Sequence, residues 1–77
     1  MEKTLREFYI GECGVVAGVD AVGAIKRRIF DMGITPGTAI ILRKTAPLGD
    51  PIEITVRGYR LSIRKAEAET IRMRPAE

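Results

Sequence analysis

The sequence predicts a mainly β protein with one α-helix, folded as a small, partly open β-barrel. Short runs of alternating apolar and polar residues recur between clusters of glycine and proline, which is typical of strands joined by tight turns. Only one stretch, residues 20–33, has the apolar period of an α-helix. The chain has 77 residues, so these elements have to share one thin core.

The N-terminal part of the chain predicts one turn and one strand. Residues 4–12 are expected to form a single turn, with Leu5 and Phe8 available for the core. Residues 14–19 are rich in valine and bounded by glycine, which predicts a strand with a bulge at Gly18.

The predicted helix is amphipathic. One stripe of its surface carries the apolar side chains Val22, Ile25, Ile29 and Met32. Asp20 is placed to cap the helix by accepting hydrogen bonds from the amides of the first turn. The basic residues 26–28 lie off the stripe and are expected to face solvent.

Two glycines follow the helix in the stretch "DMGITPG", residues 31–37. Gly33 stands just past the last apolar helical position, where a left-handed residue closes a helix, and Ile34 is expected to pack back on the last turn. Pro36 and Gly37 fit a type II turn. A phosphate-binding loop would need a preceding strand and a Lys-Ser/Thr pair, and neither is present. Both glycines are therefore predicted to reverse the backbone between helix and strand.

The middle of the chain predicts a strand and a loop. Residues 38–44 are expected to form the strand, since they are apolar and β-branched at their start. Residues 46–51 break it, with Gly49, Asp50 and Pro51 as the turn residues.

Residues 52–64 predict a β-hairpin about a two-residue turn at Arg57 and Gly58. In this register every apolar residue meets another, in the pairs Val56 with Tyr59, Ile54 with Leu61, and Ile52 with Ile63. All six side chains are therefore expected to face the core.

The C-terminal residues predict two more short elements. Residues 65–70 are expected to form a helical turn, and residues 71–74 a closing strand with Ile71 and Met73 inward. Four or five short strands and one helix in so small a chain favour the partly open barrel.

Three stretches together resemble the ferrous-iron transport protein A (FeoA) family. They are "IKRRIFDMGITPG", "APLGDPIEI" and "LSIRKAEAETI", and the resemblance covers nearly the whole chain, residues 1–77, as a single FeoA-like domain. It implies a src-homology-3-like (SH3-like) barrel with an inserted helix. It also implies a cytoplasmic accessory protein that works beside the FeoB-type membrane transporter of Fe(II). The family has no agreed catalytic residues to carry over.

Composition limits the compartment and the partners. The net charge of +3 permits an acidic partner or nucleic acid but demands neither. No run approaches the ~20 apolar residues that span a bilayer, and the charged stretch "MEKTLREFYIGE" is not a signal peptide. The single cysteine, Cys13, fits a reducing compartment. We expect a soluble cytoplasmic domain.

The residue types argue against an enzyme. The chain has no histidine, the commonest general base and metal ligand. Its one thiol cannot form a paired-cysteine site for zinc or an iron–sulfur cluster. Ser62 lies on a predicted strand with no partner base, so we expect a solvent-facing residue and no catalytic residues.

Metal ligation has only scattered candidates, namely Glu12, Cys13, Asp31, Asp50 and Glu53. Asp50 is expected to organise its loop. Glu53 is expected to pair with Arg60 and Arg64 across the hairpin, and Cys13 to be a small buried residue. We therefore expect no cofactor and no tight iron site, with at most weak surface coordination of Fe(II) or another divalent transition metal.

The first functional hypothesis is an adaptor that binds a protein, the cytoplasmic part of the transporter. Small barrels offer exposed strand edges and shallow apolar grooves. Ile41 points opposite to Ile40 and Leu42, so it lies either at an interface or under the helix. The candidate contact residues are Ile41, Arg60 and Arg64. At most a weak homo-oligomer and no insertion into the membrane are expected.

The second hypothesis is nucleic-acid binding, because small barrels often bind single strands. It would use the residues Arg43, Arg57, Arg60, Arg64, Arg72 and Arg74. It lacks surface aromatic side chains that stack on bases, since Tyr59 is assigned inward. A further alternative is a stand-alone equivalent of the SH3-like domain of an iron-dependent repressor. We favour the adaptor and expect no nucleic acid as a partner.

Overall fold

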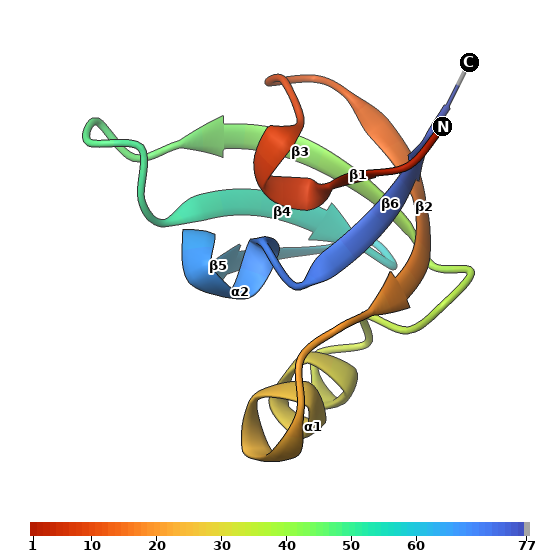
Figure 1. Ribbon diagram of the computed structural model, residues 1–77. Coiled ribbons are helices and arrows are strands. Elements are labelled where there is room, and N and C mark those ends of the chain that lie inside the picture. Colours follow the sequence, from red (N-terminus) through yellow and green to blue (C-terminus); the bar gives the residue numbers. More distant parts are fainter. Residues whose placement is uncertain (77) are drawn as a thin grey trace.

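Six strands form one curved antiparallel sheet in the order β1-β6-β2-β3-β4-β5, as Figure 1 shows. The computed structural model describes residues 1–76. Its strands are β1 (Lys3–Thr4), β2 (Cys13–Val19), β3 (Ala39–Thr45), β4 (Ile52–Val56), β5 (Tyr59–Ile63) and β6 (Ile71–Pro75). The helical elements are a 3₁₀ turn η1 (Leu5–Glu7), α1 (Gly23–Asp31) and α2 (Lys65–Ala68). The predicted mainly β, partly open architecture is confirmed.

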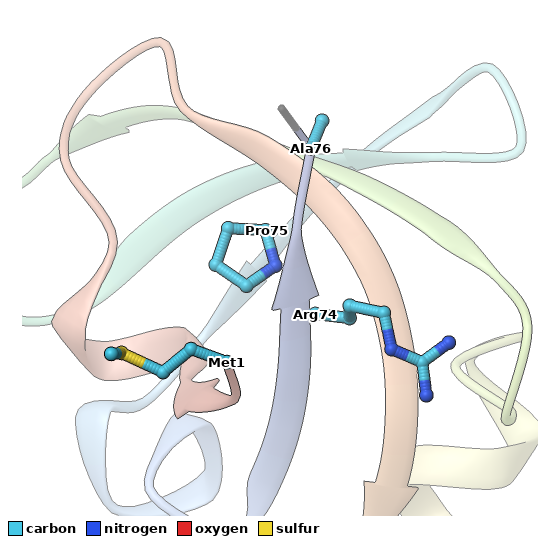
Figure 2. A pocket seen from close by; sticks show the side chains of 4 residues that line it. All are labelled: Met1, Arg74, Pro75 and Ala76. Atoms are coloured by element: carbon cyan, nitrogen blue, oxygen red, sulfur yellow. The ribbon is translucent and has the colours of Figure 1, made fainter.

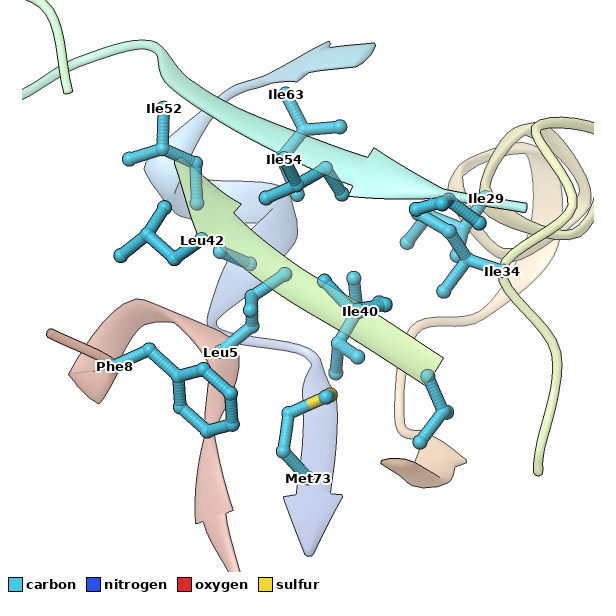
Figure 3. Close-up of a cluster of buried hydrophobic side chains, with 14 of the residues drawn as sticks. Leu5, Phe8, Ile29, Ile34, Ile40, Leu42, Ile52, Ile54, Ile63 and Met73 are labelled. Carbon is cyan, nitrogen blue, oxygen red and sulfur yellow. The ribbon is translucent and has the colours of Figure 1, made fainter. Parts of the chain in front are cut away.

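The core lies on the concave side of the sheet, and the N-terminal segment closes it (Figure 3). Leu5 and Phe8 are buried there, as predicted. Ile71 and Met73 of β6 are also fully buried. Each large apolar side chain of this kind stabilises the fold by roughly 1.5–3 kcal/mol when it leaves water.

Strand β2 bends against β6 at the predicted bulge. The register shifts between Val16 and Gly18, which lets the strand curve around the core. Gly14 has a different role, because β6 approaches it closely. A Cβ atom there would lie 2.6 Å from the carbonyl oxygen of Arg74 and 2.9 Å from the ring of Phe8. Only glycine fits this contact without a shift of the backbone.

Helix α1 differs from the prediction in its first half. It begins at Gly23, and Asp20 does not cap it, because its carboxylate accepts a hydrogen bond from Arg72 Nε at 2.9 Å. Val22 and Ile25 are 80% and 53% exposed, so the predicted apolar stripe is buried only at Ile29 and partly at Met32. The helix projects beyond the sheet (Figure 1), and only its last turn reaches the core.

The end of α1 follows the prediction. Gly33, with φ at +89°, donates to the carbonyl oxygen of Phe30, and Ile34 donates to that of Ile29. These two bonds form a Schellman motif, and Ile34 is fully buried. Gly37 has φ at +91°. The amide of Thr38 donates to the carbonyl oxygen of Thr35, and this bond closes the predicted type II turn.

The hairpin of β4 and β5 has the predicted register at all three apolar pairs. Arg57 and Gly58 have φ at 50° and 83°, so the turn is of type I′. The expectation that every paired side chain is buried is wrong at Tyr59, which is 70% exposed, and Leu61 is only partly buried. The physical reason is that β5 is an edge strand, so Val56 opposite Tyr59 is covered on both sides and is 1% exposed, whereas Tyr59 has a neighbouring strand on one side only.

The loop after β3 is held by its own backbone and by Asp50. Gly49, with positive φ, donates to the carbonyl oxygen of Ala46, and Ala46 donates to that of Pro51. Asp50 Oδ1 accepts a hydrogen bond from the amide of Lys65 at 3.0 Å. Asp50 therefore organises the loop, as predicted, and ties it to the start of α2.

Candidate functional site

The candidate contact residues Ile41 and Arg60 share the outer face of the sheet, which is the side away from the core. The register aligns Cys13, Ile41, Thr55 and Arg60 across β2, β3, β4 and β5. Directly opposed residues of an antiparallel sheet project to the same side. We call these four residues the outer row. Ile41 is partly exposed within it, between Cys13 and Thr55.

The apolar part of the outer face lies over β2 and β3. The prediction that Cys13 is buried is wrong, because β2 begins at this residue and Gly14 takes the first inward position. Val15 follows on the outer side, 38% exposed, and pairs with Ala39. A small patch of apolar side chains therefore surrounds Ile41.

A basic rim borders this patch. The register of β3 against β4 shifts between Leu42 and Lys44, so Arg43 and Lys44 both lie on the outer side. Arg43 Nε donates to Thr55 Oγ1 at 2.9 Å, and Lys44 Nζ lies 3.9 Å from Glu53 Oε2. The bulge could not be foreseen from the regular alternation of residues 38–44.

Glu53 is the shared anion of this rim. Its Oε1 accepts a hydrogen bond from Arg60 Nη1 at 3.1 Å, which confirms the predicted cross-strand pair. The predicted pair with Arg64 is not formed, and Arg64 has no ion pair within residues 1–76. The rim thus holds four cations, Arg43, Lys44, Arg60 and Arg64, of which only Lys44 and Arg60 lie within ion-pair distance of its one carboxylate.

Arg64 instead borders a hollow of about 220 Å³ at the end of β5. Arg28 and Glu67 line the same hollow. The Glu67 side chain is only 10% exposed. Its Oε1 accepts a hydrogen bond from the amide of Arg64 at 2.9 Å, and its Oε2 lies 3.5 Å from Arg28 Nε. The sequence analysis did not predict the hydrogen bond between the Arg64 amide and Glu67. The signal for it was the spacing of three residues from Arg64 to Glu67, which places a carboxylate at the third position of a helical turn.

The metal-ligand candidates do not gather. Within residues 1–76, no three His, Cys, Asp or Glu side chains are grouped to hold a metal ion. Glu12 accepts the amide of Tyr9 at 2.8 Å and pairs with Lys3, and the Tyr9 amide is the main cause that lowers the pKa of Glu12. Asp31 is exposed at the end of α1. Neither belongs to a group of three donor side chains within residues 1–76, so they do not form a chelating set.

A larger hollow, about 590 Å³, lies between the two ends of the chain (Figure 2). Met1, Arg74, Pro75 and Ala76 line it. These described lining residues include no nucleophilic side chain and no metal-ligand set. In the described part of the chain, no helix has the length and apolar character needed to cross a membrane.

Comparison with known proteins identifies the family. The family model described as the FeoA domain matches residues 3–75. A fusion of Fe(2+) transport protein A to the Fe(2+) transporter FeoB, from Porphyromonas gingivalis, is 33% identical over 67 residues. That match covers 87% of this chain but 8% of the fusion protein, so the chain spans a small part of this curated relative.

Solved structures agree with this family. An FeoA-like protein of Clostridium acetobutylicum is 40% identical, with a TM-score of 0.90 over 96% of this chain and 86% of the other. The FeoA of Stenotrophomonas maltophilia, described in complex with zinc as a prokaryotic SH3 domain protein, is 27% identical, with a TM-score of 0.81 over 92% and 88%.

A manganese-dependent transcriptional repressor shares the fold alone, at 18% identity and a TM-score of 0.89 over 97% of this chain and 37% of the repressor.

The family model and the FeoA relatives match most of this chain. The chain belongs to the FeoA domain family, which is linked to ferrous-iron transport, and has its SH3-like fold.

Proposed function

We propose that the chain is a cytoplasmic, non-enzymatic accessory protein of Fe(II) uptake that binds the cytoplasmic part of an FeoB-type transporter. The observation that carries this proposal is the Porphyromonas gingivalis relative, in which transport protein A and the transporter are one fused chain. Fusion holds two partners at a high effective concentration. Where the two are separate chains, complementary surfaces have to supply that association.

The outer face is the surface that suits this role best. It combines the apolar patch around Ile41 with the basic rim of Arg43, Lys44, Arg60 and Arg64. Protein interfaces commonly have an apolar centre and a polar rim, and arginine is enriched in them. A partner with apolar side chains flanked by carboxylates would complement this face.

The test is a binding titration of the purified chain against the cytoplasmic part of the FeoB-type transporter from the same organism. We expect Ile41→Asp to weaken binding at least about tenfold, because a charge would replace an apolar contact. Leu48→Asp is the matched control, since Leu48 is 95% exposed in the loop after β3 and lies outside the outer face. Absence of binding by the wild type would refute the accessory role.

Nucleic-acid binding is the second candidate, and the excess of cations over carboxylates on the rim favours it. Ion pairs reduce this excess elsewhere, since Arg72 is paired with Asp20 and Glu2. We expect negligible binding to random single- or double-stranded oligonucleotides at physiological salt in fluorescence anisotropy. A nucleic-acid protein with five phosphate contacts on duplex DNA would bind with a log–log salt slope of about −4 to −5. Micromolar binding with that slope would replace the adaptor proposal.

A further inference from the structure

Strand β5 has an unpaired edge of regular geometry. The two-residue turn makes Val56 and Tyr59 a hydrogen-bonded pair, so Leu61 and Ile63 also point their backbone groups toward β4. The amides and carbonyls of Arg60 and Ser62 therefore point away from β4. Within residues 1–76, neither residue has a backbone partner on that side.

This edge has little of the usual protection against another strand. Proteins commonly shield edge strands with bulges, short lengths, covering elements or charged side chains, and of these β5 carries only the charge of Arg60. The opposite edge, β1, has two residues, whereas β5 has five residues in unbroken register with β4. Tyr59, Arg60 and Ser62 are exposed, and Leu61 is half-buried. The edge is therefore regular and accessible.

Alternating side chains give the edge two chemical faces. On the core side, Tyr59 and Leu61 offer apolar surface that no element of residues 1–76 fully covers. On the outer side, Arg60 and Arg64 stand two positions on either side of Ser62. A strand laid along this edge would bring its own alternating side chains beside these two sets.

We propose that β5 accepts an extended segment of the partner as an antiparallel seventh strand, with apolar residues alternating with acidic ones. This proposal rests on the proposed function and names the chemistry of its partner. Two acidic residues would lie opposite Arg60 and Ser62, in the hydrogen-bonded positions. The apolar residues between them would cover Leu61 and Tyr59.

Charge favours this occupant over a second copy of the chain. The rim has four cations and one carboxylate, Glu53, which forms ion pairs with Lys44 and Arg60. Two β5 edges placed side by side would bring Arg60 and Arg64 of both copies to one face, where like charges repel. An acidic strand would instead gain cross-strand pairs with the same residues. In the hollow at the end of β5, Arg28 is paired with Glu67, whereas Arg64 has no ion pair within residues 1–76 and is open to a further carboxylate.

The first test uses wild-type chain and a labelled synthetic peptide in which three valines alternate with two glutamates between glycine ends. Fluorescence anisotropy is expected to show saturable binding. N-methylation of the two glutamate amides should weaken it at least about tenfold, because these amides would donate to β5. N-methylation of the middle valine alone is the matched control, since its amide would face away. Equal loss with both modified peptides, or no binding by the parent peptide, would overturn the proposal.

The second test changes the edge itself. Ser62→Pro removes an amide that β4 does not use, so the hairpin is expected to keep its pairing while strand addition is blocked. Ser62→Thr keeps the amide and serves as the control. Arg60→Glu combined with Arg64→Glu should weaken binding of the glutamate peptide and strengthen binding of a peptide with lysines in its place. Failure of this charge reversal would contradict the acidic partner.

The transporter distinguishes failure of this site from failure of the accessory role. Equal binding of wild type and folded Ser62→Pro to the transporter's cytoplasmic part would overturn strand addition and leave the accessory role intact. Binding of the peptide but not of the transporter would refute the accessory role alone. A dimer of wild type that Ser62→Pro dissociates in sedimentation would assign the edge to a second copy and overturn the proposed partner.

Discussion

Gly33 and Gly37 have backbone torsions that β-branched residues rarely adopt, with φ at +89° and +91°. Gly37→Val is expected to cost at least about 1–2 kcal/mol of unfolding free energy, and Gly33→Val a similar amount. Within residues 1–76, apart from Gly37 and its two neighbours in the chain, no heavy atom lies within 4 Å of a Cβ placed at Gly37, so the cost there comes from backbone strain and not from a clash. Gly37→Asn, which tolerates positive φ, should lose less. Chemical denaturation with both valine variants within error of wild type would contradict the turn assignment.

Single residues were predictable where their partners are close in sequence. The positive φ of Gly33 and Gly37 follows from the helix end and the turn chemistry beside them. Asp20 was assigned to the wrong role because its actual partner, Arg72, is 52 positions away. Cys13 was assigned to the core because cysteine is usually buried. Its actual face depends on where β2 begins, and Gly14 takes the inward position that admits β6.

Helix α1 is stabilised at one end only. Ile29 is fully buried and Ile25 is 53% exposed, although both lie on the same predicted stripe. Ile29→Ala is therefore expected to cost about 2–5 kcal/mol, and Ile25→Ala no more than about 0.5 kcal/mol. Urea denaturation of the two variants provides the comparison. Equal losses would mean that the first half of the helix packs against the core in solution.

The N-terminal turn should make stability depend on acid pH. The amide of Thr4 donates to Glu7 and lowers its pKa, and the amide of Tyr9 does the same for Glu12. Because both pKa values are lower in the folded state, the contribution is present above about pH 4.3, the ordinary glutamate value. It is lost as the pH falls through the lowered values.

Melting temperatures between pH 2 and 7 test this sign. Glu7→Gln and Glu12→Gln together should flatten the fall in stability below about pH 4.3, since neither side chain can then bind a proton. Asp31→Asn serves as an exposed control at the end of α1, outside this turn. A variant that keeps the full acid dependence of the wild type would assign that dependence to other carboxylates.

The pairing register of the strands could be predicted from the sequence, but the exposure of their side chains could be predicted less well. The hairpin pairing followed from alternation on both sides of Arg57 and Gly58, because one local turn sets the whole ladder. The exposure of Tyr59 did not follow, since it depends on which distant element covers β5. The outer-side position of Arg43 depends on a bulge in β3 where this strand pairs with β4. The candidate surface is thus largely a product of long-range pairing.

At the scale of the whole molecule, the oxygen and sulfur donors are dispersed. Within residues 1–76 no three of them are grouped, and the chain has no histidine. We expect Fe(II) to bind weakly and without fixed stoichiometry in anaerobic titration calorimetry. Cys13→Ser should leave the titration unchanged, because a lone thiol does not chelate. A saturable one-site curve of sub-micromolar affinity would refute this expectation.

Strands β1 and β6 bring the two chain ends together, with Lys3 opposite Met73 and with Met1 and Ala76 beside one hollow (Figure 2). The order of the strands along the chain can therefore be changed, by joining the two ends, without changing their order in the sheet. A circular permutant that joins the ends through a short glycine linker and opens the chain at Leu48 should reach the same sheet, since that loop residue is almost fully exposed. Matching circular dichroism spectra and one cooperative melt would demonstrate it. In such a permutant β5 would remain an edge, at the opposite side of the sheet order from the new junction.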